Sequence, residues 1–364
     1  MRTDQIVESG PTGGMVTRIV RADVEDAADD VIHEVAAILR GGGLVAIPTE
    51  TVYGLCAAAQ SHRAVKAVFA AKGRPSHNPL IVHVSGLEMA GSIGELGPLG
   101  HALAARFWPG PLTLVARRRP HARVADEVTG GGTTVAIRLP ASPLMRQIID
   151  AAGPLVAPSA NRSGRVSATS AAAVMDELGG RVPLILDGGP SPIGVESTVV
   201  DVTDAPRLLR PGAISPECVA AVVGPLAARG SVVEGPLRSP GLLSSHYAPR
   251  AALRLDVPAQ DVRPDEGWLA LGDAASAAGS ARTVRLSMGC DLAEAARGLY
   301  AGLRMLDGTG VSVIAVSPIP AEGIGIAIRD RLLRAAAPRP VSASSTCGAD
   351  TAAEPAAHEE ATGP

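Results

Sequence analysis

The chain has few aromatic residues, few cysteines and almost no lysine. Phe, Trp and Tyr make up 2% of its 364 residues, so the core must consist mainly of Val, Ile, Leu and Ala. The four cysteines, Cys56, Cys218, Cys290 and Cys347, are widely spaced and form no C-x-x-C pair. This pattern excludes a common structural zinc site and a disulfide framework, and it favours a reducing compartment. We therefore expect a cytoplasmic protein.

Charge and hydropathy exclude further classes. The formal net charge at pH 7 is −3, so the chain as a whole does not attract nucleic acid or an anionic membrane. Any anion must therefore be bound by a local group of cations. No apolar run approaches the roughly 18 residues that span a bilayer, and the N-terminal stretch MRTDQIVESGPTGG lacks the apolar core of a signal peptide. The sequence also contains no G-x-S-x-G motif, no H-E-x-x-H motif and no Walker-type phosphate loop.

Length and patterning predict two domains of the α/β class. Short apolar runs alternate with helical segments, as they do in α/β domains. We expect a leader over 1–16, a larger α/β domain over 17–212, a linker and candidate lid over 213–250, a smaller α/β domain over 251–337, and a disordered tail over 338–364.

The expected elements follow from this alternation. In the larger domain we expect strands over 43–49, 80–84, 112–118, 133–140, 154–159, 183–189 and 197–203. We expect helices over 23–40, 61–71, 142–151 and 169–178, with Asp23, Ser61, Ser142 and Thr169 as N-caps. In the smaller domain we expect strands near Arg254, over 267–272 and over 311–318, and helices over 291–306 and 328–336.

Cations stand at the ends of several expected elements. Lys72 and Arg74, in KGRPSHNPLIVHV, follow a helix, while Arg138 ends the apolar run VAIR and Arg210 ends the run LLR. Open α/β sheets bind ligands at strand ends, and Lys and Arg are the side chains that hold phosphate. Each cation has an ordinary alternative, either a helix C-cap or an arginine that reaches solvent. Together they predict an anionic ligand with several charges.

Hydroxyl and amide groups follow the same strands. Thr49 and Thr51 lie in PTETVYGL, and Ser159, Asn161 and Ser167 lie in APSANRSGRVS. Such groups can hydrogen-bond a small polar ligand, although a polar turn and an ordinary loop would have a similar composition. These segments predict a second, small zwitterionic ligand beside the anion.

Several motifs, in this order, resemble the YrdC-like domain of threonylcarbamoyl-AMP synthases: PTETVYGL, KGRPSHNPLIVH, WPGPLT, TVAIRLP, APSAN, GVESTVVD and LLRPG. The resemblance covers about residues 17–212. SPG…SHYAP (239–249) and EGIGIAIRDRLLRAA (322–336) resemble the linker and C-terminal domain of the longer, two-domain form. The resemblance implies a YrdC-like domain with a twisted mixed sheet and flanking helices, followed by a smaller, Rossmann-like α/β domain.

The resemblance also implies an activity. The family consists of nucleotidyltransferases that convert L-threonine, bicarbonate and ATP into L-threonylcarbamoyl-AMP and pyrophosphate. A partner enzyme, a tRNA threonylcarbamoyltransferase, then modifies adenosine 37 of tRNA to N6-threonylcarbamoyladenosine (t6A). We expect Mg²⁺ to accompany ATP, held mainly by phosphate oxygens and water, because the sequence shows no clustered carboxylate pair. We expect no tightly bound organic cofactor, no membrane contact and no need for direct tRNA binding.

The motifs of the family assign roles to individual residues of this chain. By this resemblance the threonine-binding residues are Thr49, Thr51, His83, Arg138, Ala157 and Ser197. The ATP-binding residues are Lys72, Arg74, Asn78, Thr134, Ser159, Asn161, Ser167, Arg210 and His246. Lys72 and Arg74 are also the catalytic candidates, since they would offset charge that builds on the phosphates. No residue is expected to be a metal ligand.

Two alternatives remain open at the level of sequence. An RNA-binding or ribosome-associated YrdC-like module would use the same cations, but the acidic net charge and the scarcity of aromatics count against it. A carbamoyltransferase domain, as in hydrogenase maturation proteins of the same fold, would bring zinc-finger regions. This chain has neither the cysteines nor the length for them.

Overall fold

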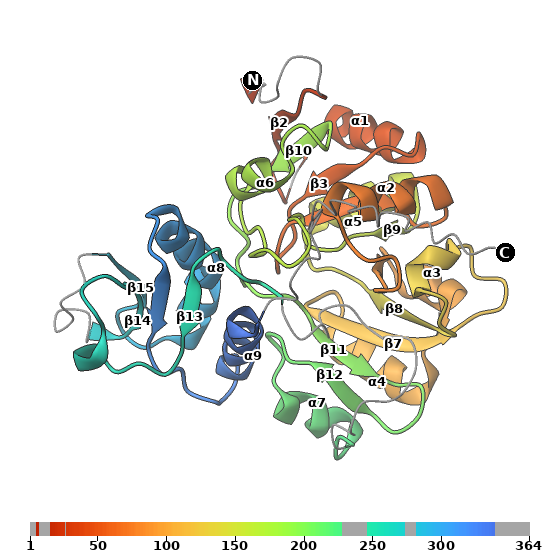
Figure 1. Ribbon diagram of the computed structural model, residues 1–364. Coiled ribbons are helices and arrows are strands. Elements are labelled where there is room, and N and C mark those ends of the chain that lie inside the picture. The colour runs from red at the N-terminus through yellow and green to blue at the C-terminus, as the bar shows by residue number, and fades with distance from the viewer. Residues whose placement is uncertain (1–4, 7–14, 26, 228–245, 274–281, 339–364) are drawn as a thin grey trace, which may run out of the picture.

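The computed structural model describes residues 5–6, 15–25, 27–227, 246–273 and 282–338. Within them the chain forms a large part around a twelve-stranded mixed sheet and a small part around a four-stranded sheet (Figure 1). The predicted fold class, a mixed-sheet α/β domain with a smaller α/β domain, is confirmed. No helix in these ranges is both long and apolar enough to cross a membrane.

The large sheet has the strand order β1-β2-β10-β3-β4-β9-β5-β8-β7-β11-β12, and β6 pairs with β7. Its strands are β1 (Gln5–Ile6), β2 (Arg18–Arg21), β3 (Val45–Ile47), β4 (Gly54–Ala58), β5 (Ile81–His83), β6 (Gly94–Glu95), β7 (Leu112–Arg118), β8 (Thr134–Arg138), β9 (Leu155–Val156), β10 (Leu184–Asp187), β11 (Thr198–Asp201) and β12 (Arg207–Arg210). Since β5 runs parallel to β8 with His83 opposite Arg138, the last residues of both strands meet at one edge.

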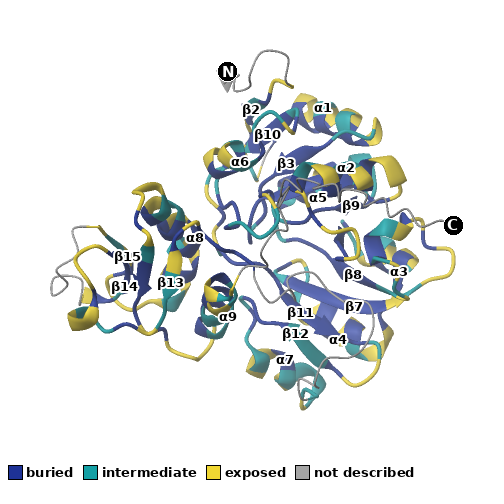
Figure 2. Ribbon diagram, viewed as in Figure 1, coloured by how far each residue is buried: buried dark blue, intermediate teal, exposed yellow. Residues whose placement is uncertain are grey.

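Helices cover the faces of this sheet. They are α1 (Asp29–Arg40), α2 (His62–Lys72), α3 (Leu87–Ile93), α4 (Gly97–Phe107), α5 (Pro143–Ala152), α6 (Ala171–Leu178) and α7 (Pro216–Val223), with a 3-10 turn at Asp126–Thr129. The central strands are buried, β2 and β12 near the ends of the sheet are partly exposed, and the helices expose their outer faces (Figure 2). As the scarcity of aromatics predicts, the buried core is mainly Val, Ile, Leu and Ala.

Two of the four predicted N-caps are correct. The hydroxyl of Ser61 accepts a hydrogen bond from the first turn of α2, and the hydroxyl of Ser142 does the same for α5. The other two predictions are wrong. Asp23 accepts from the Glu25 amide in a turn, so α1 begins only at Asp29. Ser170, not Thr169, caps α6, because its hydroxyl accepts from the amide three residues on.

Several elements were not predicted from the sequence. They are the strands β1, β2, β4, β6, β12 and β15 and the helices α3, α4 and α7. β4, with the sequence GLCAA, has no β-branched residue, yet it lies buried between β3 and β9. Helix α7 lies inside the segment that was expected to be an irregular linker. Nearly all of the predicted leader and tail, and residues 228–245 of the linker, lie outside the described residues.

The small part contains a parallel sheet of order β13-β16-β14-β15. Its elements are β13 (Ala252–Arg254), a 3-10 turn (Ala259–Asp261), β14 (Gly267–Leu271), β15 (Thr283–Ser287), α8 (Leu292–Gly308), β16 (Val313–Val316) and α9 (Gly325–Ala336). α8 and α9 lie between this sheet and the large part (Figure 1). The contact is close at Gly194, where an added Cβ would lie 2.4 Å from the Cα of Arg297 on α8.

Candidate active site

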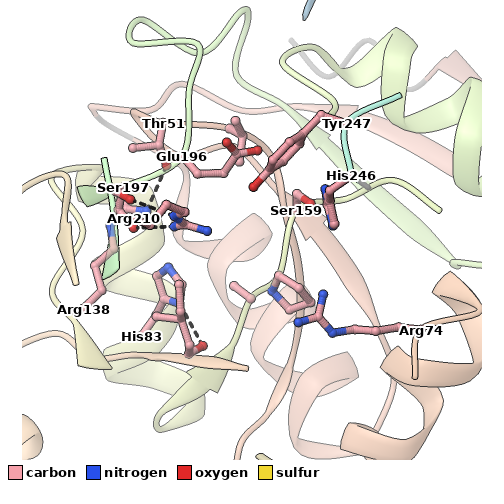
Figure 3. Close-up of a pocket in the computed structure, with 14 residues that line it drawn as sticks. Thr51, Arg74, His83, Arg138, Ser159, Glu196, Ser197, Arg210, His246 and Tyr247 are labelled. Carbon is pink, nitrogen blue, oxygen red and sulfur yellow. Dashed lines mark hydrogen bonds between the residues drawn. The ribbon is translucent and has the colours of Figure 1, made fainter. Parts of the chain in front are cut away.

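A buried cavity lies where β5, β8 and β12 end and the chain re-enters from the linker (Figure 3). Of the predicted threonine-binding residues, the structure brings Thr51, His83, Arg138, Ala157 and Ser197 to its wall. Of the predicted ATP-binding residues, Arg74, Ser159, Arg210 and His246 line it. These nine of the fifteen predicted residues thus meet in one cavity, with Arg138 and His83 on one side and Arg74 on the other (Figure 3).

Arg138 is fixed before any ligand arrives. It is 4% exposed, its Nη1 donates to Thr51 Oγ1 at 2.8 Å, and its Nη2 forms an ion pair with Glu50 at 2.5 Å. Thr51 in turn shares a 2.9 Å hydrogen bond with Thr49, whose own side chain lines a second cavity beside Glu50. Thr49 therefore holds the Thr51 hydroxyl in place without lining the first cavity itself. A guanidinium next to hydroxyl groups is a suitable receptor for a carboxylate.

Glu50 was not predicted as a site residue. Burial alone would raise the pKa of this carboxyl, but the neighbouring Arg138 guanidinium and hydrogen bonds lower it below its usual 4.5. The group is therefore anionic at neutral pH and balances Arg138. The only signal in the sequence was its place between two threonines of PTETVYGL.

Arg74 and Arg210 supply positive charge to the other half of the cavity. Arg74 donates from Nη2 to the Pro79 carbonyl at 2.9 Å and from Nε to the Asn78 carbonyl at 3.3 Å. Burial lowers its pKa to about 10, so the guanidinium stays charged at pH 7. Arg210 donates to the Ser197 carbonyl at 3.1 Å and to the Ser197 hydroxyl at 3.0 Å. Two buried guanidinium groups are thus held at defined positions for an anion.

Ser197 lies between Arg210 and strand β7. Its hydroxyl accepts from Arg210 and lies 2.7 Å from the hydroxyl of Thr113 on β7. Ser197 directly precedes β11, which pairs with β7, so this contact follows from the sheet register. Thr113 was not singled out from the sequence, although it ends the WPGPLT motif.

Lys72 does not line the cavity. Its ammonium group is buried and donates to the backbone carbonyls of Ser159 and Asn161, so it holds the loop that carries Ser159. Burial, and then the charge of Arg74, lower its pKa well below the usual lysine value. The Asn161 side chain donates to the carbonyls of Arg162 and Arg165 and shapes the same loop. Neither Lys72 nor Asn161 is among the residues that line the cavity, and their ligand roles remain predictions.

Three further predicted residues also lie outside the cavity wall. The side-chain amide of Asn78 is buried without a hydrogen-bond partner among the described atoms, and its backbone carbonyl accepts a hydrogen bond from Arg74. Ser167 donates to Glu196 Oε1 at 2.6 Å. Thr134 begins β8, whereas Arg138 ends it, so about 13 Å of strand separates them. The ligand roles of these residues remain predictions.

His246 and Tyr247 cover the cavity from the linker side (Figure 3). Their rings lie 4.1 Å apart, and Tyr247 has a φ of 62°, a left-handed conformation that non-glycine residues rarely adopt. Burial lowers the pKa of His246 to about 3, and burial together with Arg138 lowers that of His83 to about 3. Both imidazoles are therefore neutral at pH 7 and do not add to the positive charge. Tyr247 was not predicted as a site residue.

Glu196 provides a carboxylate at the cavity wall, and it too was not predicted. Its Oε1 accepts from Ser167, and its Oε2 accepts from Tyr300 at 2.9 Å and from Arg331 at 2.8 Å. Because both oxygens are engaged, this group is a poor metal ligand. Among the described residues no three His, Cys, Asp or Glu side chains gather as a metal site.

The fold and the site define a class: a two-domain α/β protein with a buried cavity lined by three arginines and several hydroxyl groups. Residues 37–212 match the Sua5_yciO_yrdC family, described as "Telomere recombination". Residues 214–337 match the family described as "Threonylcarbamoyl-AMP synthase, C-terminal domain".

Relatives and solved structures agree with these matches. The chain is 41% identical over 328 residues to a threonylcarbamoyl-AMP synthase of Bacillus subtilis, covering 85% of this chain and 94% of the relative. It is 41% identical over 323 residues to a Pyrococcus abyssi relative of the same name, covering 84% and 93%. The crystal structure of P. abyssi Sua5 complexed with L-threonine superposes with a TM-score of 0.80 at 37% identity, covering 87% of this chain and 97% of that one. The chain belongs to the threonylcarbamoyl-AMP synthase family, in its two-domain form.

Proposed function

We propose that this protein is an L-threonylcarbamoyladenylate synthase, a nucleotidyltransferase that converts L-threonine, bicarbonate and ATP into L-threonylcarbamoyl-AMP and pyrophosphate. One observation carries the proposal: Arg74, Arg138 and Arg210 come from separate elements and reach a single buried cavity lined with hydroxyl groups. Family membership supports the same reaction. The P. abyssi neighbour was crystallised with L-threonine, which supports threonine as the amino acid.

The chemistry needs orientation and charge, and no protein nucleophile. Arg138, Thr51 and Ser197 would hold the threonine carboxylate and hydroxyl, with neutral His83 beside them. The threonine amine attacks CO₂ derived from bicarbonate and loses a proton, which gives a carbamate. A carbamate oxygen then forms a bond to the α-phosphorus of ATP as the bond from that phosphorus to the pyrophosphate oxygen breaks.

Arg74 and Arg210 would offset the negative charge on the phosphates during this displacement. Mg²⁺ on the phosphate oxygens would add further charge compensation. Lys72 contributes by fixing the loop that carries Ser159. Holding both substrates in one cavity with the reacting atoms aligned would lower the entropic part of the barrier.

ATP cannot enter the cavity in this conformation. Only about 50 Å³ is accessible to the centre of a water molecule, whereas ligand pockets measure roughly 300–1,000 Å³. We therefore expect the segment with His246 and Tyr247 to move away when ATP binds and to return over it. The product would pass to a tRNA threonylcarbamoyltransferase for t6A formation at adenosine 37, which implies a cytoplasmic location.

Mass spectrometry tests the proposal directly. Incubation with ATP, L-threonine, bicarbonate and Mg²⁺ should yield threonylcarbamoyl-AMP, and pyrophosphate release should need both threonine and bicarbonate. Lys72→Ala and Arg74→Ala should each slow that release. Pyrophosphate release without threonine, or no adenylate at all, would overturn the proposal. Steeply salt-dependent RNA binding without ATP turnover would instead favour an RNA-binding module.

A further inference from the structure

A buried polar cluster joins the C-terminal domain to the cavity. Glu196, at the cavity wall, accepts hydrogen bonds from Tyr300 on α8 and from Arg331 on α9. These partners stand 104 and 135 residues away in sequence, and both are fully buried. The other Glu196 oxygen accepts from Ser167, which belongs to the large domain. Glu196 is thus held by both domains at once.

Arg331 makes further contacts that reach the same part of the cavity. Its Nη1 donates to the Pro211 carbonyl at 3.0 Å, directly after Arg210, and its Nη2 lies 3.4 Å from the Glu196 carbonyl, directly before Ser197. Its guanidinium also lies 5.3 Å from the centre of the Tyr247 ring. One side chain of the C-terminal domain therefore contacts the backbone on both sides of the Arg210–Ser197 pair.

The cluster pairs one buried carboxylate, Glu196, with one buried guanidinium, Arg331. Burial would raise the pKa of Glu196, but Arg331, and after it Arg210, lower that pKa to about 2. The Glu196 carboxylate therefore stays ionised and needs a cation close by. Arg331 forms the direct ion pair, at 2.8 Å, while Arg210 donates to Ser197. If Arg331 lost its charge, the uncompensated carboxylate would attract Arg210 away from Ser197.

We propose that Glu196, held by Arg331 and Tyr300, is a positioning residue through which the C-terminal domain orders the nucleotide-binding half of the cavity. Glu196 acts on Ser167 through a hydrogen bond and on Arg210 through charge balance. The inference rests on the proposed function, because it assigns this half to ATP. It gives the C-terminal domain a defined part in catalysis, although that domain contributes no group to the cavity wall among the described residues of β13 to α9.

Variants of the cluster test the inference in the full-length chain. Tyr300→Phe removes one hydroxyl, Arg331→Met removes the charge, and Arg331→Lys keeps it. Arg329→Met is the matched control, since Arg329 lies on the same helix but pairs with Asp256 inside the C-terminal domain. Each variant is measured for kcat and for the KM of ATP and of threonine, and for ATP binding by titration calorimetry without threonine.

We expect Arg331→Met to raise the KM of ATP at least about tenfold and Tyr300→Phe about threefold, with a clearly smaller change in the KM of threonine, which reaches the cluster only through Ser197. Arg331→Lys should recover part of the loss, and Arg329→Met should match the wild type. Equal loss for both substrates, or an unchanged KM of ATP in Tyr300→Phe, would overturn the inference. If Arg331→Met does not fold, the KM values of Tyr300→Phe and Arg331→Lys still test the inference. If the wild-type chain forms no adenylate, that result contradicts the proposed function and not this inference. The ATP affinities of the variants, measured by calorimetry, would then still test whether the cluster orders the ATP site.

Discussion

The two neutral histidines of the cavity make a quantitative prediction about stability and pH. The pKa of His83 and that of His246 are each lowered from 6.5 to about 3, chiefly by burial. In the unfolded chain both imidazoles take up protons near pH 6.5, whereas the folded chain keeps them neutral. Between these values the unfolded state binds more protons, so the free energy of unfolding falls as the pH is lowered.

The expected slope follows from the number of protons. Each histidine contributes up to about 1.4 kcal/mol per pH unit, so the pair contributes up to about 2.7 kcal/mol per unit. The window from pH 6.5 to 5.5 is governed mainly by the histidines. The carboxyls of Glu50 and Glu196, whose pKa values are lowered in the folded chain, begin to add their own loss about one unit above their unfolded value of 4.5. A loss of a few kcal/mol is a large share of the usual 5–15 kcal/mol of a domain.

Urea unfolding at several pH values measures this slope. We expect His83→Gln and His246→Gln each to remove about half of the wild-type slope, whatever their effect on absolute stability. His101→Gln is the control, because His101 is exposed on α4. A wild-type free energy of unfolding that stays constant from pH 6.5 to 5.5 would refute the reasoning. So would a slope that neither cavity variant reduces.

Three further predictions concern the cavity. Arg74→Ala should lower the rate of pyrophosphate release about 10- to 100-fold, since a charge-assisted hydrogen bond contributes about 1.5–3 kcal/mol, while Arg106→Ala at an exposed position should not. Glu50→Gln should lower the free energy of unfolding by about 3 kcal/mol in urea, because Arg138 would keep its buried charge without an anion, and a loss below 1 kcal/mol would contradict this. Removal of Mg²⁺ with a chelator should stop turnover, and activity that persists would show that the protein itself compensates the phosphate charge.

The sequence predicted much of the fold and of the cavity wall. Arg138 and Arg210 end apolar runs, and such a position marks a strand end where ligands bind, so both could be found without coordinates. The motifs of the family then placed His83 and Ser197 correctly at the wall, although their roles there stay predictions. Helix caps were predictable where a hydroxyl directly precedes the helix, as at Ser61.

The rest depends on contacts between distant segments. Lysine is a residue type that often binds phosphate, but the Lys72 ammonium group donates hydrogen bonds to two backbone carbonyls of a loop 87 and 89 residues away. Glu196 looked like an ordinary acidic residue before a strand, because its partners Tyr300 and Arg331 belong to the other domain. Local patterns contain no information about such pairs. Only the packed structure shows which polar groups face the cavity and which support it.

The close approach of α8 to Gly194 bears on how chimeras of this family should be designed. Any side chain at Gly194 would collide with the backbone of α8, and the residue has a φ of 84° that favours glycine. A large domain joined to the C-terminal domain of another protein would thus dock only if Gly194, Glu196 and the residues of α8 and α9 that contact them are all retained. The contact of Gly194 and Glu196 with α8 and α9 should therefore be kept intact in a chimera. Both sides of this contact should come from the same parent protein.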